Sequence, residues 1–141
     1  MSGAPEVVVA DRSVIRRFHG QRSQEWRTPP EVYAALDAEF HFTLDPCQPG
    51  RTDGLTRSWI GERVYCNPPY RHGSIERWLA KAYEPPLAVY LLPSRTGANW
   101  WADAMCADEI RFIRGRLKFG GSTVNSIEWS CILVFRNAMH S

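Results

Sequence analysis

The sequence contains no long hydrophobic run. None of its apolar stretches approaches the roughly 18 residues that mark a membrane-spanning helix, and its N-terminus lacks a signal-peptide pattern. Its cysteines form no C-x-x-C pair and have no nearby histidine at metal-ligand spacing, which argues against zinc and redox chemistry. They are Cys47, Cys66, Cys106 and Cys131. We therefore expect a cytoplasmic protein with reduced core thiols, no metal and no contact with a membrane.

A strong net charge is also missing. The 17 basic and 15 acidic side chains leave a net charge of only +2, which is too small to indicate nucleic-acid binding by itself. The basic residues are 15 Arg and 2 Lys. Arginine suits bidentate contacts to phosphate or guanine, but a codon bias toward arginine explains the count equally well. Charge alone does not decide the partner.

The length and composition fit one domain. With 141 residues, of which 44% are hydrophobic, the chain has room for one core and no separate large recognition domain. Residues 1–24 mix a Val7–Val9 run with several basic residues and no sustained period, so we expect a partly ordered basic arm. Such an arm can lie along DNA phosphates, although most are solvated tails. Residues 25–141 are expected to form the domain.

Hydrophobic periodicity in the domain predicts alternating helices and strands. Thr28 is a candidate N-cap, with prolines in the first turn and Glu31 at the capping-box position. The pattern predicts helices at 28–39, 74–83 and 99–106. It predicts strands at 41–44, 63–66, 87–92, 109–113, 116–119 and 130–135. This alternation favours an α/β fold, a mixed sheet flanked by helices with a parallel centre.

The segment Asn67-Pro68-Pro69-Tyr70 is the most specific chemical feature. Both Asn67 and Pro68 precede a proline, which restricts them to extended geometry, so the turn is stiff. Such a turn can aim the Asn67 side-chain oxygen and the Pro68 carbonyl at the two hydrogens of one amino group, while Tyr70 offers a ring for stacking. These acceptors favour a pyramidal nitrogen whose lone pair points at an electrophilic methyl group. The segment therefore predicts methyl transfer to nitrogen, although a plain proline-rich turn is the alternative.

Several motifs in the same order resemble the small, phage-type DNA N6-adenine methyltransferases, the Dam-like family. The similarity extends from Glu25 to about Arg136. It covers Glu25-Trp26-Arg27-Thr28-Pro29, Phe42-Thr43-Leu44-Asp45-Pro46-Cys47, Asp53-Gly54-Leu55, Trp59, Cys66-Asn67-Pro68-Pro69-Tyr70, Trp78, Leu92-Pro93-Ser94-Arg95-Thr96, Trp100 and Phe112-Ile113-Arg114-Gly115-Arg116-Leu117-Lys118-Phe119. The resemblance implies a Rossmann-like methyltransferase fold, S-adenosylmethionine as donor and DNA adenine as acceptor. If the protein is phage-encoded, its place is the host cell cytoplasm.

The resemblance also implies a set of donor-binding residues. Asp45, which opens the loop with Pro46 and Cys47, should face the ammonium of the donor's methionine part; a strand-ending Asp-Pro is the alternative. Thr28 and Pro29 resemble the element beside the donor carboxylate, and helix capping is the equal alternative.

Two further positions belong to this implied set. Trp26 is a candidate cover for the donor's adenine. Asp53 can reach the donor, although a simple Asp-Gly turn is favoured.

The pattern departs from that of most methyltransferases, because the loop after Asp45 has only one nearby glycine. From position 45 to position 67 there is also little room for the usual strand and helix pairs. We therefore expect a reduced fold.

Basic residues near strand ends are the candidates for DNA contact. Asp45, Asn67 and 94–96 each follow a predicted strand, and ligands of open α/β sheets gather at such ends. Arg95 and Thr96 can contact a DNA phosphate, with a surface ion pair as the equal alternative. Arg114 and Arg116 flank a predicted turn that can enter a groove, although a solvated turn is favoured.

Two other functional interpretations remain open. An NPPY clamp also suits a glutamine side chain of a protein or an amino group in RNA. The second of these interpretations is a non-catalytic DNA-binding module with a degenerate donor site. The sequence leaves the oligomeric state open between a monomer and a homodimer.

Overall fold

A computed structural model of the chain describes residues 4–10, 28–70, 73–114 and 129–138. Five strands form one sheet in the order β1-β4-β5-β3-β2. They are β1 (Glu6–Ala10), β2 (Arg63–Cys66), β3 (Leu87–Pro93), β4 (Glu109–Ile113) and β5 (Ser130–Arg136). The helices are α1 (Pro30–Phe40), α2 (Ile75–Ala80), the 3-10 helix η2 (Lys81–Tyr83) and α3 (Trp101–Ala104). This mixed sheet with helices confirms the predicted α/β class and is consistent with a Rossmann-like methyltransferase fold.

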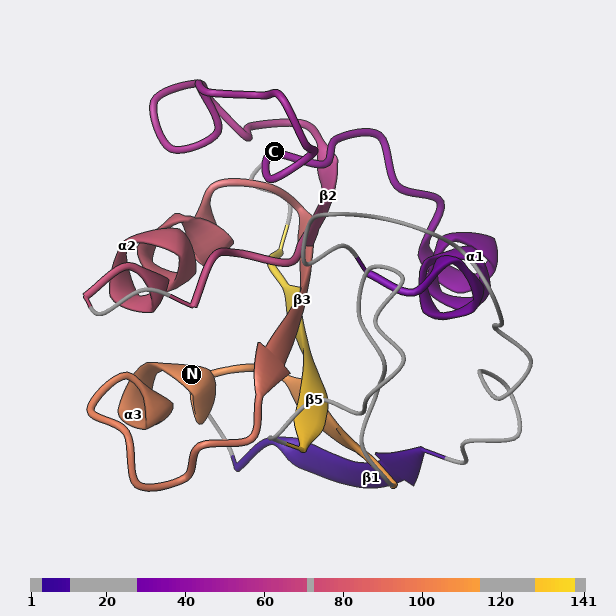
Figure 1. Ribbon diagram of the computed structural model, residues 1–141, viewed down its shortest axis with the longest axis vertical. Coiled ribbons are helices and arrows are strands. Elements are labelled where there is room, and N and C mark those ends of the chain that lie inside the picture. Colours follow the sequence, from indigo (N-terminus) through magenta and orange to yellow (C-terminus); the bar gives the residue numbers. More distant parts are fainter. Residues whose placement is uncertain (1–3, 11–27, 71–72, 115–128, 139–141) are drawn as a thin grey trace.

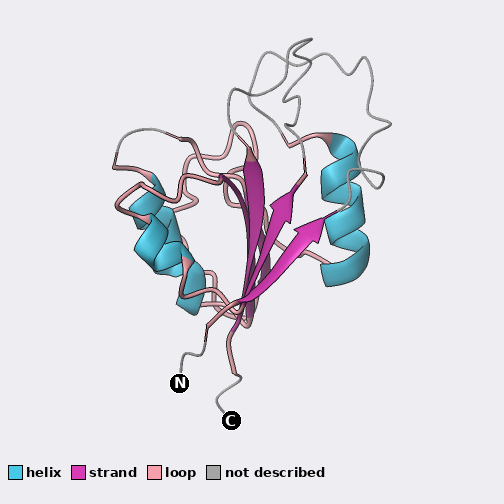
Figure 2. Cartoon of the chain, turned by 90° about the horizontal axis from the view of Figure 1, so that it is seen from below, coloured by secondary structure: helices cyan, strands magenta, loops and turns pink. Residues whose placement is uncertain are grey.

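Helices cover both faces of the sheet, with α1 on one face and α2 and α3 on the other (Figures 1 and 2). Strand β3 is buried along its whole length, so its side chains alternate between two cores. Leu87, Val89 and Leu91 pack with α1, whereas Ala88, Tyr90 and Leu92 pack with α2 and α3. Burial on both faces explains why this strand reads as one continuous apolar run.

The direction of β5 corrects one expectation. Strand β5 lies in the middle of the sheet and is antiparallel to both of its neighbours, β3 and β4, so the predicted parallel centre is wrong. Among the described strand pairs, the two outer ones, β1 with β4 and β2 with β3, are parallel. A strand buried on both faces is apolar in either direction, so hydrophobicity carries no information about its orientation.

Residues 6–10 correct a second expectation. We predicted the Val7–Val9 run as part of the basic arm, but Glu6–Ala10 forms β1 at the sheet edge, paired in register with β4. A three-residue apolar run is too short to show periodicity, and its partner strand is a hundred residues away in the sequence. Residues 11–24 of the predicted arm lie outside the described residues, so the division between arm and domain stays a prediction there.

The remaining differences concern element ends. The predicted strand at 41–44 is reduced to one bridge, between Leu44 and Val64. The helix before it ends at Phe40, and the left-handed backbone of its C-cap His41, with φ 54°, turns the chain. The last helix is shorter than predicted, because it covers only 101–104 of the expected 99–106. The predicted strand at 116–119 lies outside the described residues.

The start of α1 also differs from the capping prediction. Pro29 is the N-cap, and no side chain caps the helix. Thr28 therefore does not act as the cap, and a buried side-chain oxygen of Glu31, Oε2, has no hydrogen-bond partner among the residues that the structure describes. A proline in the first turn is present as predicted. The hydroxyl of Thr28 instead takes part in the site described next.

Candidate active site

The carboxyl ends of four strands lie at the same edge of the sheet. Strands β1 to β4 run in one direction, because β5 is antiparallel to both β3 and β4 while the outer pairs are parallel. Asn67 follows β2, Arg95 comes shortly after β3, and Arg114 follows β4. Asp45 follows the Leu44–Val64 bridge beside β2. The structure therefore places these four residues at one edge, where ligands of open α/β sheets bind.

The side chain of Asn67 is held from two sides. Its Nδ2 donates a hydrogen bond of 3.1 Å to Thr28 Oγ1, and its Oδ1 accepts one of 3.3 Å from the Tyr70 hydroxyl. The Tyr70 hydroxyl also lies 3.4 Å from the carbonyl oxygen of Leu91 in β3. Because the amide donates to Thr28, its oxygen faces away from α1 and toward Tyr70. An acceptor oxygen is thus fixed at the end of β2.

Tyr65, which no sequence motif indicated as a site residue, completes this arrangement. Its hydroxyl lies 2.6 Å from Thr28 Oγ1, and its side chain is 1% exposed. Burial raises the pKa of Tyr65 well above its usual range, so the hydroxyl keeps its proton. The sequence does contain one indication of this role: Tyr65 lies two residues before Asn67, so in an alternating strand both side chains point to the same side. Thr28 is therefore shared between a buried phenol and the amide of Asn67.

The loop after Leu44 carries a half-buried carboxylate. Burial raises the pKa of Asp45 to about 6, while the Cys47 backbone N–H and the charge of Arg51 act in the opposite direction. The Cys47 N–H donates to Asp45 Oδ1 at 3.1 Å. A raised pKa means that the surrounding protein only partly compensates the negative charge.

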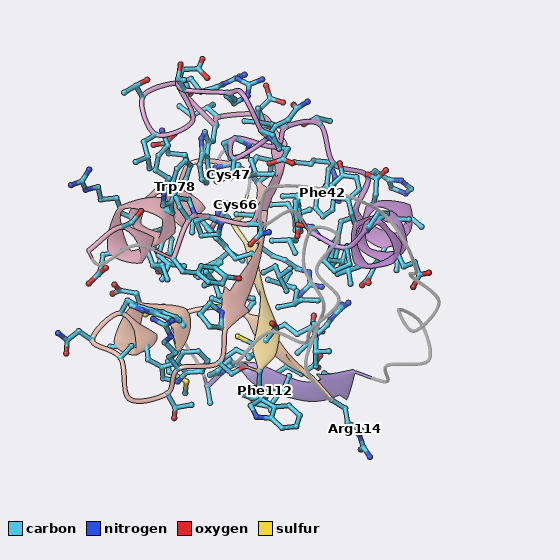
Figure 3. All side chains as sticks on the ribbon, in the orientation of Figure 1. Phe42, Cys47, Cys66, Trp78, Phe112 and Arg114 are labelled. Carbon is cyan, nitrogen blue, oxygen red and sulfur yellow. The ribbon has the colours of Figure 1, made fainter. Side chains whose placement is uncertain are left out.

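Two thiols join this loop to the strand before Asn67. Cys47 Sγ lies 3.4 Å from Cys66 Sγ (Figure 3), and burial raises the pKa of the Cys66 thiol well above its usual range. All four cysteines are free. Cys66 and Cys131 are buried as expected, but Cys106 is exposed, so the prediction of core thiols is wrong for that residue.

A glycine fixes the far end of the same loop. A Cβ atom on Gly54 would overlap the carbonyl oxygen of the buried Pro46 and come within 2.8 Å of the Trp78 ring. Asp53, next to it, is exposed, pairs with Arg51 at 2.9 Å and lies in a turn. The turn interpretation of Asp53 therefore describes its local structure.

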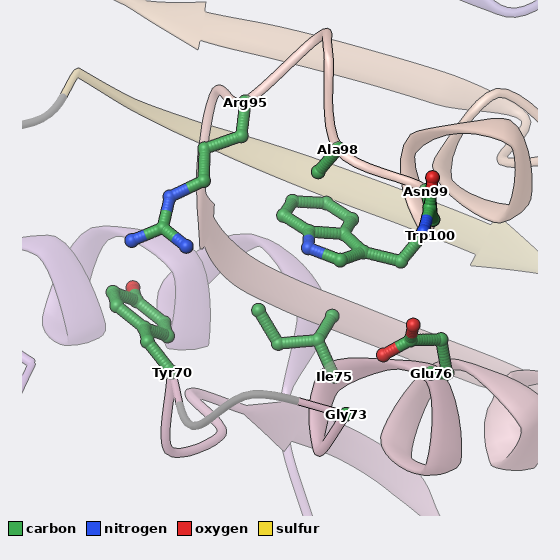
Figure 4. Close-up of a pocket in the computed structure, with 8 residues that line it drawn as sticks. All are labelled: Tyr70, Gly73, Ile75, Glu76, Arg95, Ala98, Asn99 and Trp100. Carbon is green, nitrogen blue, oxygen red and sulfur yellow. The ribbon is translucent and has the colours of Figure 1, made fainter.

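A cavity of about 470 Å3 opens beside Tyr70. Its walls come from the end of the NPPY segment, the start of α2 and the loop between β3 and α3 (Figure 4). The lining residues are Tyr70, Gly73, Ile75, Glu76, Arg95, Ala98, Asn99 and Trp100. Asn67 is not one of them, although it is partly exposed, while Pro68 is buried and Pro69 is exposed. The cavity thus borders Tyr70 but is not lined by Asn67.

The other candidate residues are spread over the same edge. Arg95 and Thr96 are exposed, and Arg95 faces the cavity. Arg114 is exposed at the end of β4 and points away from the fold (Figure 3). Trp26 and Arg116 lie outside the described residues. Within the part of the chain that the structure describes, no cluster of His, Cys, Asp and Glu could hold a metal ion, and no helix is long and apolar enough to cross a membrane.

A comparison with protein families identifies the family to which the chain belongs. Residues 17–134, more than half of the chain, match the model of the DNA N-6-adenine-methyltransferase (Dam) family. The chain belongs to the Dam family. No curated protein and no solved structure gives a match. The matched range includes Thr28, Asp45, the NPPY segment and Arg95, so the site described above lies within the Dam homology.

Membership of the Dam family gives the class of reaction. Dam proteins are DNA methyltransferases that act on adenine N6, so DNA is the substrate class that the family implies. The family resemblance expected from the sequence motifs is thereby confirmed.

Proposed function

We propose that this Dam-family protein transfers a methyl group from S-adenosylmethionine to N6 of an adenine in DNA, and that Asn67, Pro68, Pro69 and Tyr70 hold the acceptor amino group. The observation that carries the proposal is the fixed amide of Asn67, which donates to Thr28 and presents its oxygen beside Tyr70. Tyr70 in turn borders a cavity large enough for a nucleobase. A preset acceptor next to a stacking ring fits an amino-bearing heterocycle.

Replacement of one weak hydrogen bond makes room for the substrate. The bond from the Tyr70 hydroxyl to Asn67 Oδ1 is 3.3 Å long, well beyond the typical O–H···O distance of roughly 2.7–2.8 Å. An N6 hydrogen of adenine can replace it at little cost, and Tyr70 keeps its second contact to the Leu91 carbonyl. The second N6 hydrogen is assigned to the carbonyl of Pro68, which the two prolines hold in place.

Asn67 and the Pro68 carbonyl act most strongly in the transition state. The lone pair of adenine N6 is delocalised into the ring, so the nitrogen is a poor nucleophile until it becomes pyramidal. Two fixed acceptors favour the pyramidal nitrogen with its developing positive charge, and they need no reorganisation as the reaction proceeds. Positioning and preset dipoles, rather than a strong general base, lower the barrier.

The opposite side of Asn67 fits the methyl donor. S-adenosylmethionine would supply a methyl group on a sulfonium centre and carries an ammonium group as well. Asp45 has the matching property, because burial already raises its pKa to about 6 and a cation beside it would compensate its charge. Thr28 bonds both Asn67 and the buried Tyr65, so it holds the Asn67 amide while Tyr70 contacts the amide oxygen. Pro46 and Cys47 shape the loop that holds Asp45.

DNA has to present the adenine outside its stack. Unstacking and unpairing cost a few kcal/mol in a duplex, and stacking on Tyr70 would recover part of that. Arg95, Thr96 and Arg114 lie on the same edge and are assigned to the DNA backbone. Their exposed positions match the wide, shallow contact that a phosphate strand makes.

The proposal is tested by the fate of a labelled methyl group. The protein is incubated with DNA, RNA and a protein extract in the presence of labelled donor, and the nucleosides and amino acids are separated. We expect label in N6-methyladenine from DNA. Label found only in RNA or in protein glutamine would contradict the DNA assignment, and absence of donor binding by calorimetry would favour a non-catalytic DNA-binding module.

Two substitutions at Asn67 test the clamp. Asn67→Ala removes the acceptor oxygen and should lower kcat by at least roughly 100-fold, as the loss of a preset transition-state hydrogen bond does elsewhere. Donor binding should stay close to that of the wild type. Asn67→Asp keeps an acceptor at the same place but loses the donor to Thr28, so we expect an intermediate rate. Full activity of Asn67→Ala would disprove the clamp.

A further inference from the structure

The cavity extends well past the ring that would hold the acceptor base. Tyr70 and Arg95 lie at one end, Glu76 and Asn99 at the other, and Ile75 and Trp100 face each other between them (Figure 4). Its volume of about 470 Å3 falls within the range of roughly 300–1,000 Å3 found for sites of small organic ligands. An adenine stacked on Tyr70 with N6 at Asn67 would occupy only the near end, which leaves the far end for a second group.

The walls of the far end suit a flat group with hydrogen-bond donors. Trp100 and Ile75, which lie between the two ends, line the cavity and are otherwise buried at 6% and 2% exposure, so they form a rigid apolar wall next to the far end. A carboxylate such as that of Glu76 offers only acceptor oxygens, and among the described residues the Glu76 side chain has no hydrogen bond or ion pair. A phosphate would be repelled by this carboxylate, whereas the amino group of a base would satisfy it.

We propose that the far end of the cavity binds the nucleotide next to the acceptor adenine in the same DNA strand, stacked on Trp100 with an exocyclic amino group donating to Glu76. This inference rests on the proposed function in one respect, because it uses Tyr70 to mark the place of the acceptor. The cavity connects Tyr70 directly to Glu76, so consecutive nucleotides of one strand can occupy its two ends. Glu76 then makes the methylation site dependent on the neighbouring base.

The chemistry of the bases predicts which neighbour is preferred. Cytosine presents an N4 amino group that pairs well with a carboxylate. Thymine presents a carbonyl oxygen at the same place, which the carboxylate repels. A carboxylate in a base-reading position therefore separates cytosine from thymine, two pyrimidines that also differ by the C5-methyl group of thymine.

The test measures binding of short oligonucleotides without the methyl donor. Single-stranded 12-mers contain one adenine, and the base on its 5′ or 3′ side is either cytosine or thymine, so that no unpairing cost enters. Fluorescence anisotropy gives each Kd. On one of the two sides, thymine should weaken binding by about 5- to 100-fold, the usual range for one good base contact.

Three variants make the result specific to the carboxylate. Glu76→Gln can both donate and accept, so the difference between cytosine and thymine should shrink to less than about twofold. Glu76→Asp keeps the carboxylate and should retain a preference for cytosine. Glu6→Gln, on the exposed edge of β1, removes the same charge far from the cavity and should bind like the wild type. A thermal melt of each variant verifies that it is folded.

The outcomes separate this inference from the proposed function. Equal binding of cytosine and thymine on both sides, or unchanged discrimination in a folded Glu76→Gln, overturns the neighbour subsite even if N6-methyladenine is formed. A preference for cytosine over thymine that depends on Glu76 supports the subsite even if no methyl transfer is found. In that case the proposed catalysis is contradicted and the subsite is not.

Discussion

The hydroxyl of Thr28 should couple stability to the orientation of Asn67. In Thr28→Val the side chain keeps its shape but can no longer bond Tyr65 or Asn67. The Tyr65 hydroxyl is then buried without its partner, because the residue is only 1% exposed. An unsatisfied buried hydroxyl costs about 1–3 kcal/mol. For a chain of this size the melting temperature should fall by roughly 3–5 °C per kcal/mol.

A double-mutant cycle isolates this effect. Tyr65→Phe removes the hydroxyl that Thr28→Val leaves stranded, so the cost of Tyr65→Phe alone should be smaller, about 0.5–1.5 kcal/mol. The double variant should cost little more than Tyr65→Phe, so the coupling free energy should be close to the whole cost of Thr28→Val, about 1–3 kcal/mol. Urea unfolding followed by circular dichroism measures all four corners of the cycle.

The same variants separate stability from activity. Thr28→Ser keeps the hydroxyl and should retain both the stability and most of the methyl transfer. Thr28→Val should lose transfer as well, because the amide of Asn67 is no longer held from the α1 side. Strictly additive free energies in the cycle, together with normal activity of Thr28→Val, would refute the shared role of this hydroxyl.

Two further variants probe the loop beside the site. The pKa of Asp45 is raised to about 6 by burial, so its ionised form opposes folding above pH 6 and this penalty disappears as the pH falls toward the ordinary value near 3.8. Asp45→Asn should therefore raise the melting temperature at pH 8 but not at pH 4. Donor affinity of the wild type should weaken below pH 6, and pH-independent affinity would argue against Asp45 as the partner of the ammonium group. Gly54→Ala should lower both stability and donor affinity, because its Cβ atom would overlap the Pro46 carbonyl. Gly97→Ala is the control, since no atom lies within 4 Å of its added Cβ, and equal donor affinities and melting temperatures in the two alanine variants would contradict the packing argument.

Local chemistry in the sequence predicted the positions of the site better than the connections of the sheet. The placement of Asn67 after a strand and the helix over most of 28–39 follow from short-range rules about proline and periodicity, and both are present in the structure. The antiparallel direction of β5 depends on the connection that precedes it, and the pairing of β1 with β4 joins distant segments. Neither property leaves a local pattern of residues.

Two details of the site show the same limit. Thr28 has the sequence context of a helix cap, but its hydroxyl bonds residues that lie 37 and 39 positions away. Tyr65 reads as an ordinary apolar strand residue until its hydroxyl is seen against Thr28. Both depend on tertiary contacts, which override local preference when a buried hydroxyl needs a partner.

The five-stranded sheet can be completed only after β5 has been synthesised. Strand β5 pairs with both β3 and β4, so it alone joins the β1/β4 pair to the β2/β3 pair within the described sheet. During synthesis, the β2/β3 pair and the β1/β4 pair therefore share no strand ladder until residues 130–136 have left the ribosome. A chain that stops before that point would contain the NPPY segment but lack the ladder that holds it in register with the rest of the site edge.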